Sequence, residues 1–210
     1  MISQSKKKIY IIGINPLDIG DCTVQAIEKI RQSELIILPP KSGNSFIYSI
    51  KNKNNIYLQE DLSKKNNIFL WKKILNLLKQ NQTIGHLVDG DPFIDHDGFK
   101  ESNFFLEKDI KCEIIPGVIR VINNINKNLD LLTDREKNSS VTFMKPFNLR
   151  RLTKIIKNSH FEKLVVYIKS VDEIDDIRSV LLNYNSNYKI NLNFKNRIFN
   201  NSDFNFSSKF

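Results

Sequence analysis

The chain has 210 residues, of which 40% are apolar and 26% charged, and its formal net charge is +9. This length suits one large domain or two of about 100 residues, and the composition excludes a disordered or fibrous protein. No apolar run approaches the roughly 20 residues that span a bilayer, and the basic start at Lys6 precedes too short an apolar run for a signal peptide. We therefore expect a cytoplasmic protein without a membrane partner. Because its basic residues are scattered, we expect no nucleic-acid partner.

Short apolar runs alternate with helical patterns along the first half of the chain. Asp21 is a candidate cap for the first helix, and Ile68, Trp71, Leu75 and Leu78 form the apolar face of the clearest one. Stretches bounded by proline, glycine or asparagine predict strands. The expected strands are 9–14, 35–38, 56–58, 83–88 and 112–115, and the expected helices are about 21–32, 68–80 and 98–107.

The second half continues this alternation. The expected helices are about 118–126, 149–158 and 172–183, and the expected strands are 141–143, 164–168 and 190–194. Strands that alternate with helices favour mostly parallel sheets covered on both faces. The fold class is therefore α/β.

Three loops that follow strands are candidate ligand sites, because open α/β sheets bind ligands beyond the carboxyl ends of their strands. The first runs from Gly13 to Asp18 and can also be a turn without a ligand. The second, 89–97, contains Gly90, which permits close backbone approach, and carboxylates that can accept hydrogen bonds; it can equally be a plain turn. The third, 116–118, begins a helix whose first amides can receive an electron-rich group.

The remaining reactive side chains carry weaker signals. Cys22 and Cys112 have no paired spacing and are expected to be buried or incidental thiols. His86 lies on a predicted strand and is expected to be buried or half-buried. His96, in the second loop, either meets substrate or is solvated. No His, Cys or carboxylate spacing indicates a metal site, so none is expected.

Taken in order, the loops resemble the tetrapyrrole (corrin/porphyrin) methylase family. Its first loop is matched at Gly13, Pro16 and Asp18, with Thr23 in its usual position. Its Gly-Asp-Pro-Phe-Ile segment is matched from Gly90 to Ile94. Further matches are Ile115-Pro116-Gly117-Val118, Leu132-Thr133-Asp134-Arg135-Glu136 and Ser140-Val141-Thr142-Phe143. From Gly90 to Phe143 the correspondence needs no gap.

This resemblance implies two α/β domains with mostly parallel sheets, 1–115 and 116–210, the second shortened at its end, with a cofactor cleft between them. It implies an S-adenosyl-L-methionine-dependent methyltransferase that forms a homodimer. Within the family, the chain is most similar to members that C-methylate uroporphyrinogen III, a tetrapyrrole on the route to sirohaem and corrins. The cofactor pocket would be lined by Pro16, Gly90, Asp91 and Ile94. The catalytic acidic residue of the first loop would be Asp18.

Several positions depart from the family pattern, and they fall on polar or ligand-side positions. Leu17 replaces a glycine, Pro39 replaces an aspartate after the second strand, and Asp97 replaces an arginine. A bulky residue does not easily take the place of a glycine that adopts positive φ. Two alternatives therefore stay open: another precorrin methyltransferase, or a degenerate, non-catalytic homologue that keeps the fold.

Overall fold

The computed structural model describes residues 7–40, 42–50, 55–62, 67–119, 122, 133, 140–144, 148–157, 163–166, 172–183, 192–194 and 197–199. The chain divides into two compact units, Met1–Asn123 and Asn124–Phe210. Each is described here by itself. The domain boundary expected after residue 115 stays a prediction, because a compact unit is not thereby an independently folding domain.

The first unit is built on a five-stranded sheet in which every neighbouring pair of strands is parallel. The strand order is β3-β2-β4-β1-β5. β1 is flanked by strands that come much later in the chain, since Lys8 pairs with both Thr83 and Lys111. The strands are β1 (Lys8–Ile14), β2 (Leu35–Leu38), β3 (Asn55–Leu58), β4 (Thr83–Asp89) and β5 (Lys111–Ile115).

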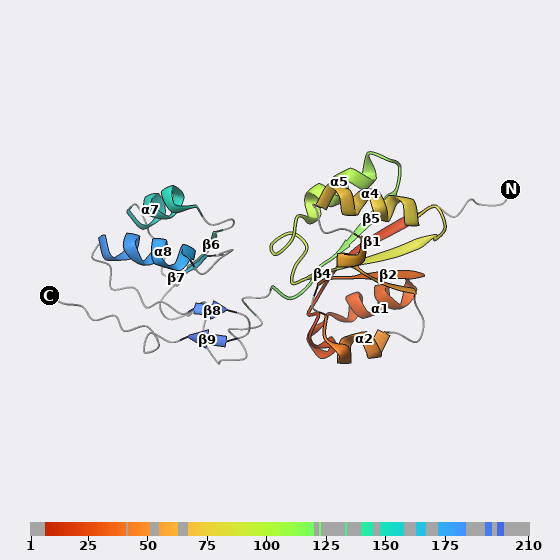
Figure 1. The fold of residues 1–210 in the computed structure, drawn as a ribbon, viewed down its shortest axis with the longest axis horizontal. Helices are drawn as coiled ribbons and strands as arrows, with labels where there is room; N and C mark the ends of the chain where they lie inside the picture. Colours follow the sequence, from red (N-terminus) through yellow and green to blue (C-terminus); the bar gives the residue numbers. More distant parts are fainter. Residues whose placement is uncertain are drawn as a thin grey trace. The chain divides into compact units, whose positions relative to one another are not determined.

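Helices cover both faces of this sheet, with α1 and α2 on one face and α4 and α5 on the other (Figure 1). Right-handed crossovers between parallel strands produce this arrangement. The helical segments are η1 (Ile19–Asp21), α1 (Val24–Gln32), α2 (Asn44–Ile50), α3 (Gln59–Leu62), α4 (Asn67–Leu77) and α5 (Gly98–Leu106).

Two apolar cores result, one on each face. Side chains of successive strand residues point to opposite faces, so β1 sends Tyr10 and Ile12 toward α1 and sends Ile9 toward α4 and α5. Phe46 of α2 is fully buried in the first core, and Phe105 of α5 is fully buried in the second. Because both faces are covered, the strands read as continuous apolar runs rather than as alternating patterns.

The first helix begins differently from the sequence prediction. Thr23, not Asp21, caps α1, because its side-chain oxygen accepts the Ala26 N–H at 3.1 Å. Asp21 instead ends η1, and its Oδ2 accepts a hydrogen bond from Asn15 Nδ2 at 2.7 Å. The prediction of Asp21 as the cap was therefore wrong, since a short 3₁₀ turn precedes the helix.

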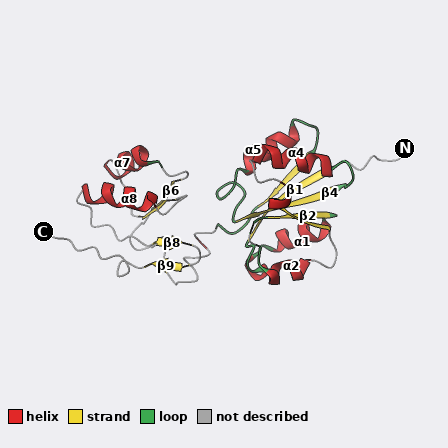
Figure 2. Cartoon of the chain, in the orientation of Figure 1, coloured by secondary structure: helices red, strands yellow, loops and turns green. Residues whose placement is uncertain are grey.

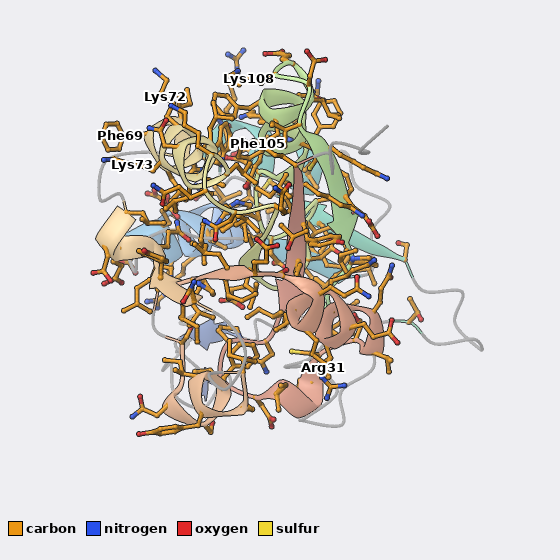
Figure 3. The ribbon with its side chains drawn as sticks, turned by 90° about the vertical axis from the view of Figure 1, so that its right-hand side faces the viewer. Arg31, Phe69, Lys72, Lys73, Phe105 and Lys108 are labelled. Carbon is orange, nitrogen blue, oxygen red and sulfur yellow. The ribbon has the colours of Figure 1, made fainter. Side chains whose placement is uncertain are left out.

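The buried face of α4 also differs in part from the prediction. Trp71 and Leu78 are buried as expected, but Ile68 is 54% exposed. Leu70 and Ile74 are buried in its place. The outer side of the helix carries Lys72 and Lys73 (Figure 3). α4 has apolar residues on two neighbouring stripes of its surface, and its packing against the sheet determines which stripe is buried.

In the described residues of the second unit there are two small sheets and two helices. β6 (Val141–Met144) pairs in parallel with β7 (Lys163–Val166), and β8 (Leu192–Phe194) pairs antiparallel with β9 (Arg197–Phe199). α7 (Leu149–Lys157) and α8 (Asp172–Asn183) contribute Leu152, Ile156 and Val180 to a core with Met144. Figure 2 shows the helices and strands of both units by type. The prediction of an α/β fold with mostly parallel sheets is confirmed.

Most expected elements are present, within a few residues of their predicted bounds. Six of the nine residues of the expected helix at 118–126 lie outside the described residues, as do 167–168 and 190–191 of two expected strands. Four short elements were not predicted: η1, α2, α3 and β9. Within the part of the chain that is described, no helix has the length and apolarity needed to cross a membrane.

The packing of α5 gives a stability prediction. Phe105→Ala should lower the free energy of unfolding by about 3–5 kcal/mol, because it removes a fully buried ring from the core beneath α4 and α5 (Figure 3). Leu106→Ala is the matched control, because Leu106 is the next residue of α5 and its own side chain is 54% exposed. Urea unfolding followed by circular dichroism measures both. Equal losses in the two variants would contradict this assignment of the core.

Candidate functional site

The carboxyl ends of β1 and β4 lie side by side where the connections of the sheet diverge. β1 leads through α1 to β2 on one side, whereas β4 leads through α5 past β1 to β5 on the other. Ile14 at the end of β1 pairs with Asp89 at the end of β4. The following loops therefore leave toward opposite faces, which is the topological switch point where open α/β sheets bind ligands.

Main-chain atoms from three loops touch at this edge. The Gly90 N–H donates to Ile14 O at 2.8 Å. A Cβ added to Gly13 would lie 2.5 Å from both Gly117 N and Gly90 O. One added to Gly117 would lie 2.2 Å from Gly90 O. No side chain fits at either position, so the close approach of these backbones requires glycine.

Asp91 organises the second loop through backbone amides. Its Oδ1 accepts from Phe93 N at 2.9 Å and from Ile94 N at 3.2 Å. Its Oδ2 accepts from Gly117 N at 3.3 Å, which joins the second loop to the third. Both carboxylate oxygens are thus used within the protein, so Asp91 positions the loop whatever else it contacts.

The first loop is closed by side chains that replace the glycines of the family pattern. Asn15 Oδ1 accepts from Leu17 N at 3.0 Å, while its Nδ2 binds Asp21. Leu17 does not adopt a left-handed conformation, because among the described residues Asp109 is the one non-glycine residue with positive φ. The backbone strain expected at Leu17 is therefore absent, and its side chain is 46% exposed.

Asp18 lies next to Leu17 with its carboxylate in solvent. Its Oδ1 accepts the Gly20 N–H at 2.8 Å and so caps η1, and its other oxygen remains available to a ligand or solvent. Beyond η1, Thr23 Oγ1, at the start of α1, donates to Pro116 O at 3.3 Å. The start of α1 is thereby joined directly to the third loop.

Exposed apolar side chains stand on all three loops. They are Leu17, Phe93 and Val118, exposed by 46%, 58% and 37%. The loop sequences 13–18, 89–97 and 116–119 contain five aspartates and no lysine or arginine. The edge therefore offers apolar contact surface in an acidic setting, which suits a ligand that combines an apolar ring system with a positive charge.

The predicted site residues lie in these connected loops. Pro16 is buried and its carbonyl accepts from Gly43 N at 2.8 Å, Gly90 is buried, and Ile94 is half-buried. Asp91 and Asp18 hold their loops as described. The structure thus brings the loops of all five residues to one edge of the sheet, and their contact with a cofactor stays a prediction.

Two positions that depart from the family pattern have local roles. Pro39 is buried directly after β2, and its carbonyl accepts a hydrogen bond from Ser42 Oγ at 2.8 Å. Asp97 is exposed before α5, where it lies 3.9 Å from Lys100 Nζ and makes no side-chain capping bond. Neither residue supplies a buried polar group to the edge.

A buried polar cluster on the α5 side of β4 was not foreseen from the sequence. Glu101 Oε1 is 2.6 Å from His86 Nδ1, and its Oε2 is 3.2 Å from His96 Nε2. His86 and Glu101 are fully buried, as the sequence predicts for His86, and His96 is half-buried. The one sign of this cluster in the sequence is the order of its members: nine residues separate His86 from His96, and four separate His96 from Glu101.

Burial and the charges in the cluster shift the pKa values of Glu101 and Cys112. Although burial acts to raise the pKa of Glu101, the two imidazoles lower it to about 2, so the carboxyl group is ionised. Burial, together with the charge of Glu101, raises the pKa of the nearby Cys112 thiol to about 12. Cys112 is therefore a neutral, unreactive thiol at physiological pH.

The fold and the edge define a class: a parallel α/β protein with a candidate ligand site at the loops after β1, β4 and β5. Within this class the particular family is also established. The family model of the Tetrapyrrole (Corrin/Porphyrin) Methylases matches residues 8–190, and the chain belongs to that family.

Curated relatives agree at low identity. The chain is 28% identical over 146 residues to a uroporphyrinogen-III C-methyltransferase of Cyanidium caldarium, covering 68% of this chain and 58% of the relative. It is 26% identical over 186 residues to a siroheme synthase of Blochmanniella pennsylvanica, covering 85% of this chain and 39% of the relative. The chain thus matches less than two thirds of the length of either protein.

Solved structures share the fold. A uroporphyrin-III C-methyltransferase of Thermus thermophilus, complexed with S-adenyl homocysteine, superimposes with a TM-score of 0.66 at 18% identity, covering 86% of this chain and 78% of the other. A cobalt precorrin-4 methyltransferase gives a TM-score of 0.65 at 14% identity, covering 87% and 77%. At these identities the similarity establishes the fold alone.

The contact of the three loops predicts which glycines cannot change. Gly13→Ala should lower the free energy of unfolding by about 1–3 kcal/mol or more, because its Cβ would meet main-chain atoms that cannot rotate away. Gly43→Ala is the control, since its Cβ would lie no closer than 3.4 Å to any atom. Urea unfolding of both variants measures the difference. A Gly13 variant as stable as the Gly43 variant would show that the loops do not meet as described.

Proposed function

We propose that this chain is an S-adenosyl-L-methionine-dependent methyltransferase that C-methylates a tetrapyrrole, and that its substrate is uroporphyrinogen III. The observation that carries the proposal is the edge where the loops after β1, β4 and β5 are joined through Gly13, Gly90 and Gly117. Membership of the tetrapyrrole methylases and the activity named for the curated relatives support it.

The chemical character of the edge fits the proposed cofactor. S-adenosyl-L-methionine combines a flat adenine ring with a positively charged sulfonium and an ammonium group. Leu17, Phe93 and Val118 offer apolar surface for the ring, and the acidic loops favour the cationic groups. Pro16, Gly90, Asp91 and Ile94 would line this pocket, with Asp91 holding the loop that forms it.

The residues of the chain would contribute positioning and a proton acceptor. When bound, the cofactor supplies an electrophilic methyl group, which must be held in line with an electron-rich pyrrole carbon. Methyl transfer would break the sulfur–methyl bond as the carbon–carbon bond forms, and the ring would then have to give up a proton to a nearby acceptor. Asp18 is the proposed acceptor of that proton, because its carboxylate is exposed beside the edge and uses one oxygen only for the Gly20 N–H.

The substrate carboxylates need positive charge from elsewhere in the chain. The three edge loops contain no lysine or arginine, although the whole chain carries 32 such residues. An acidic edge would hold the cationic cofactor and repel the acidic macrocycle. Recognition of the macrocycle therefore falls to residues outside these loops.

Two further parts of the proposal follow from the family resemblance: a homodimer and a cytoplasmic location. Sedimentation equilibrium of the purified chain tests the first. A monomer at micromolar concentration would remove the homodimer from the proposal and leave the assignment of the cofactor edge intact.

Isothermal titration with S-adenosyl-L-methionine tests the cofactor assignment. The full chain should bind it, and Asp91→Ala should bind at least about tenfold more weakly, because loss of both carboxylate oxygens releases the second loop from Gly117. Asp97→Ala is the control, since Asp97 lies exposed in the same segment. No heat of binding at millimolar cofactor would contradict the proposal. Equal cofactor affinities of the Asp91→Ala and Asp97→Ala variants would show that the cofactor does not bind at this loop.

Asp18→Asn separates the chemical step from folding. The amide oxygen of asparagine can still accept the Gly20 N–H, so cofactor affinity and stability should be unchanged. Methyl transfer to uroporphyrinogen III should fall by about 10²-fold or more, because the amide cannot take up a proton. Asp61→Asn, at an exposed position of α3, is the control. A full rate in the Asp18 variant would exclude it as the base.

The positions of Pro39 and Asp97 favour a second candidate, a homologue that binds the cofactor without turnover on this substrate. Proline cannot act as an acid or base, and an exposed aspartate does not bind substrate carboxylates. Cofactor binding without methyl transfer to uroporphyrinogen III, followed by an assay on later precorrins, distinguishes this candidate from another precorrin methyltransferase.

A further inference from the structure

Three side chains able to bind a metal converge on the α5 side of β4, and none of them is among the residues proposed to line the cofactor pocket. They come from three places in the first unit: His86 from the buried part of β4, His96 from the loop before α5, and Glu101 from the first turns of α5. One ligand atom from each lies within 4.8 Å of the others. Zinc ligands lie about 2.0–2.2 Å from the ion, so small movements of the side chains would be needed to place all three around one ion.

The buried carboxylate at this position has no permanently charged partner among the described residues. Glu101 is fully buried, and its ion pairs there are with the two histidines, with no lysine or arginine. A carboxylate in a low-dielectric interior needs positive charge or hydrogen-bond donors around it, and a cation bound beside the two imidazoles would supply that charge.

One nitrogen of the His86 ring is left without a partner. Its Nε2 is buried and finds no hydrogen-bond partner among the described residues, while Nδ1 contacts Glu101. In a purely structural ion pair, a buried ring nitrogen normally finds a partner. His86 and His96 also meet edge to face, with ring centroids 5.8 Å apart, and both lie beside the Glu101 carboxylate.

The ligand set and its exposure define the kind of ion. Two imidazole nitrogens and one carboxylate suit zinc and neighbouring divalent metals, whereas magnesium and calcium prefer sites built from oxygen. The side chain of His96 is 18% exposed, while the other two are fully buried. Solvent can therefore reach the cluster from the His96 side and supply the remaining ligands.

We propose that His86, His96 and Glu101 bind one divalent first-row transition-metal ion of the zinc or cobalt type, with water completing its coordination. The ion would tie the loop that contains Asp91 to both β4 and α5. This assignment is independent of the proposed methyl transfer, because it concerns other side chains on the opposite side of β4 from the core of α1.

Cobalt and zinc titrations of the chelator-treated full chain test the proposal. Co²⁺ should bind with one-to-one stoichiometry and give visible d–d absorption without a sulfur-to-cobalt charge-transfer band, which separates the site from Cys22 and Cys112. Zn²⁺ should displace it and raise the melting temperature. His96→Gln should weaken binding by more than the roughly 10–100-fold that loss of an outer partner costs.

Controls keep the result interpretable. His160→Gln removes the only other histidine of the sequence and should leave binding unchanged. Urea unfolding checks that the His96 variant is folded, which its half-buried position favours. Unaltered Co²⁺ affinity in folded His96→Gln, loss of binding in His160→Gln, or no binding by the unaltered chain would each overturn the assignment. Titration with S-adenosyl-L-methionine in the presence of chelator tests the cofactor proposal separately.

Discussion

The close approach of three backbones at the carboxyl edge of the first sheet governs the rest of this unit. Gly13, Gly90 and Gly117 lie so near one another that an added Cβ at the first or third would fall within 2.5 Å of a main-chain atom. This contact fixes where the loops after β1, β4 and β5 leave the sheet. The contact depends on backbone geometry rather than on side-chain chemistry, so it does not require the polar side chains of the loops.

The sequence was sufficient for the elements whose burial is nearly complete. The runs at Ile9, Leu35 and Ile84 are apolar on both faces and bounded by turn residues, so they are recognisable without tertiary information. By contrast, α2 contains serine, asparagine and tyrosine and has little helical pattern of its own. Its formation depends on burial of Phe46 and Ile50 against the sheet, which local sequence does not reveal.

The site was foreseeable to a similar degree. Motif order located the three loops, because glycine and proline positions reflect backbone constraints that survive divergence. The function of individual side chains was less accessible: both oxygens of Asp91 serve the protein's own amides, and Leu17 avoids strain through Asn15. The cluster of His86, His96 and Glu101 has no signal beyond the order of its members along the chain, since they meet only when β4 and α5 pack together.

The central position of β1 has a consequence for how the chain reaches its fold. β1 precedes the other strands of the sheet in the chain, yet its two neighbours are β4 and β5. Lys8 can therefore pair with Thr83 and Lys111 only after those residues have been synthesised. Until then both edges of the apolar strand are unpaired, and such edges recruit other chains. Contacts this distant in sequence also form slowly. During synthesis, this strand, which is almost completely buried in the folded unit, is therefore a segment prone to aggregation.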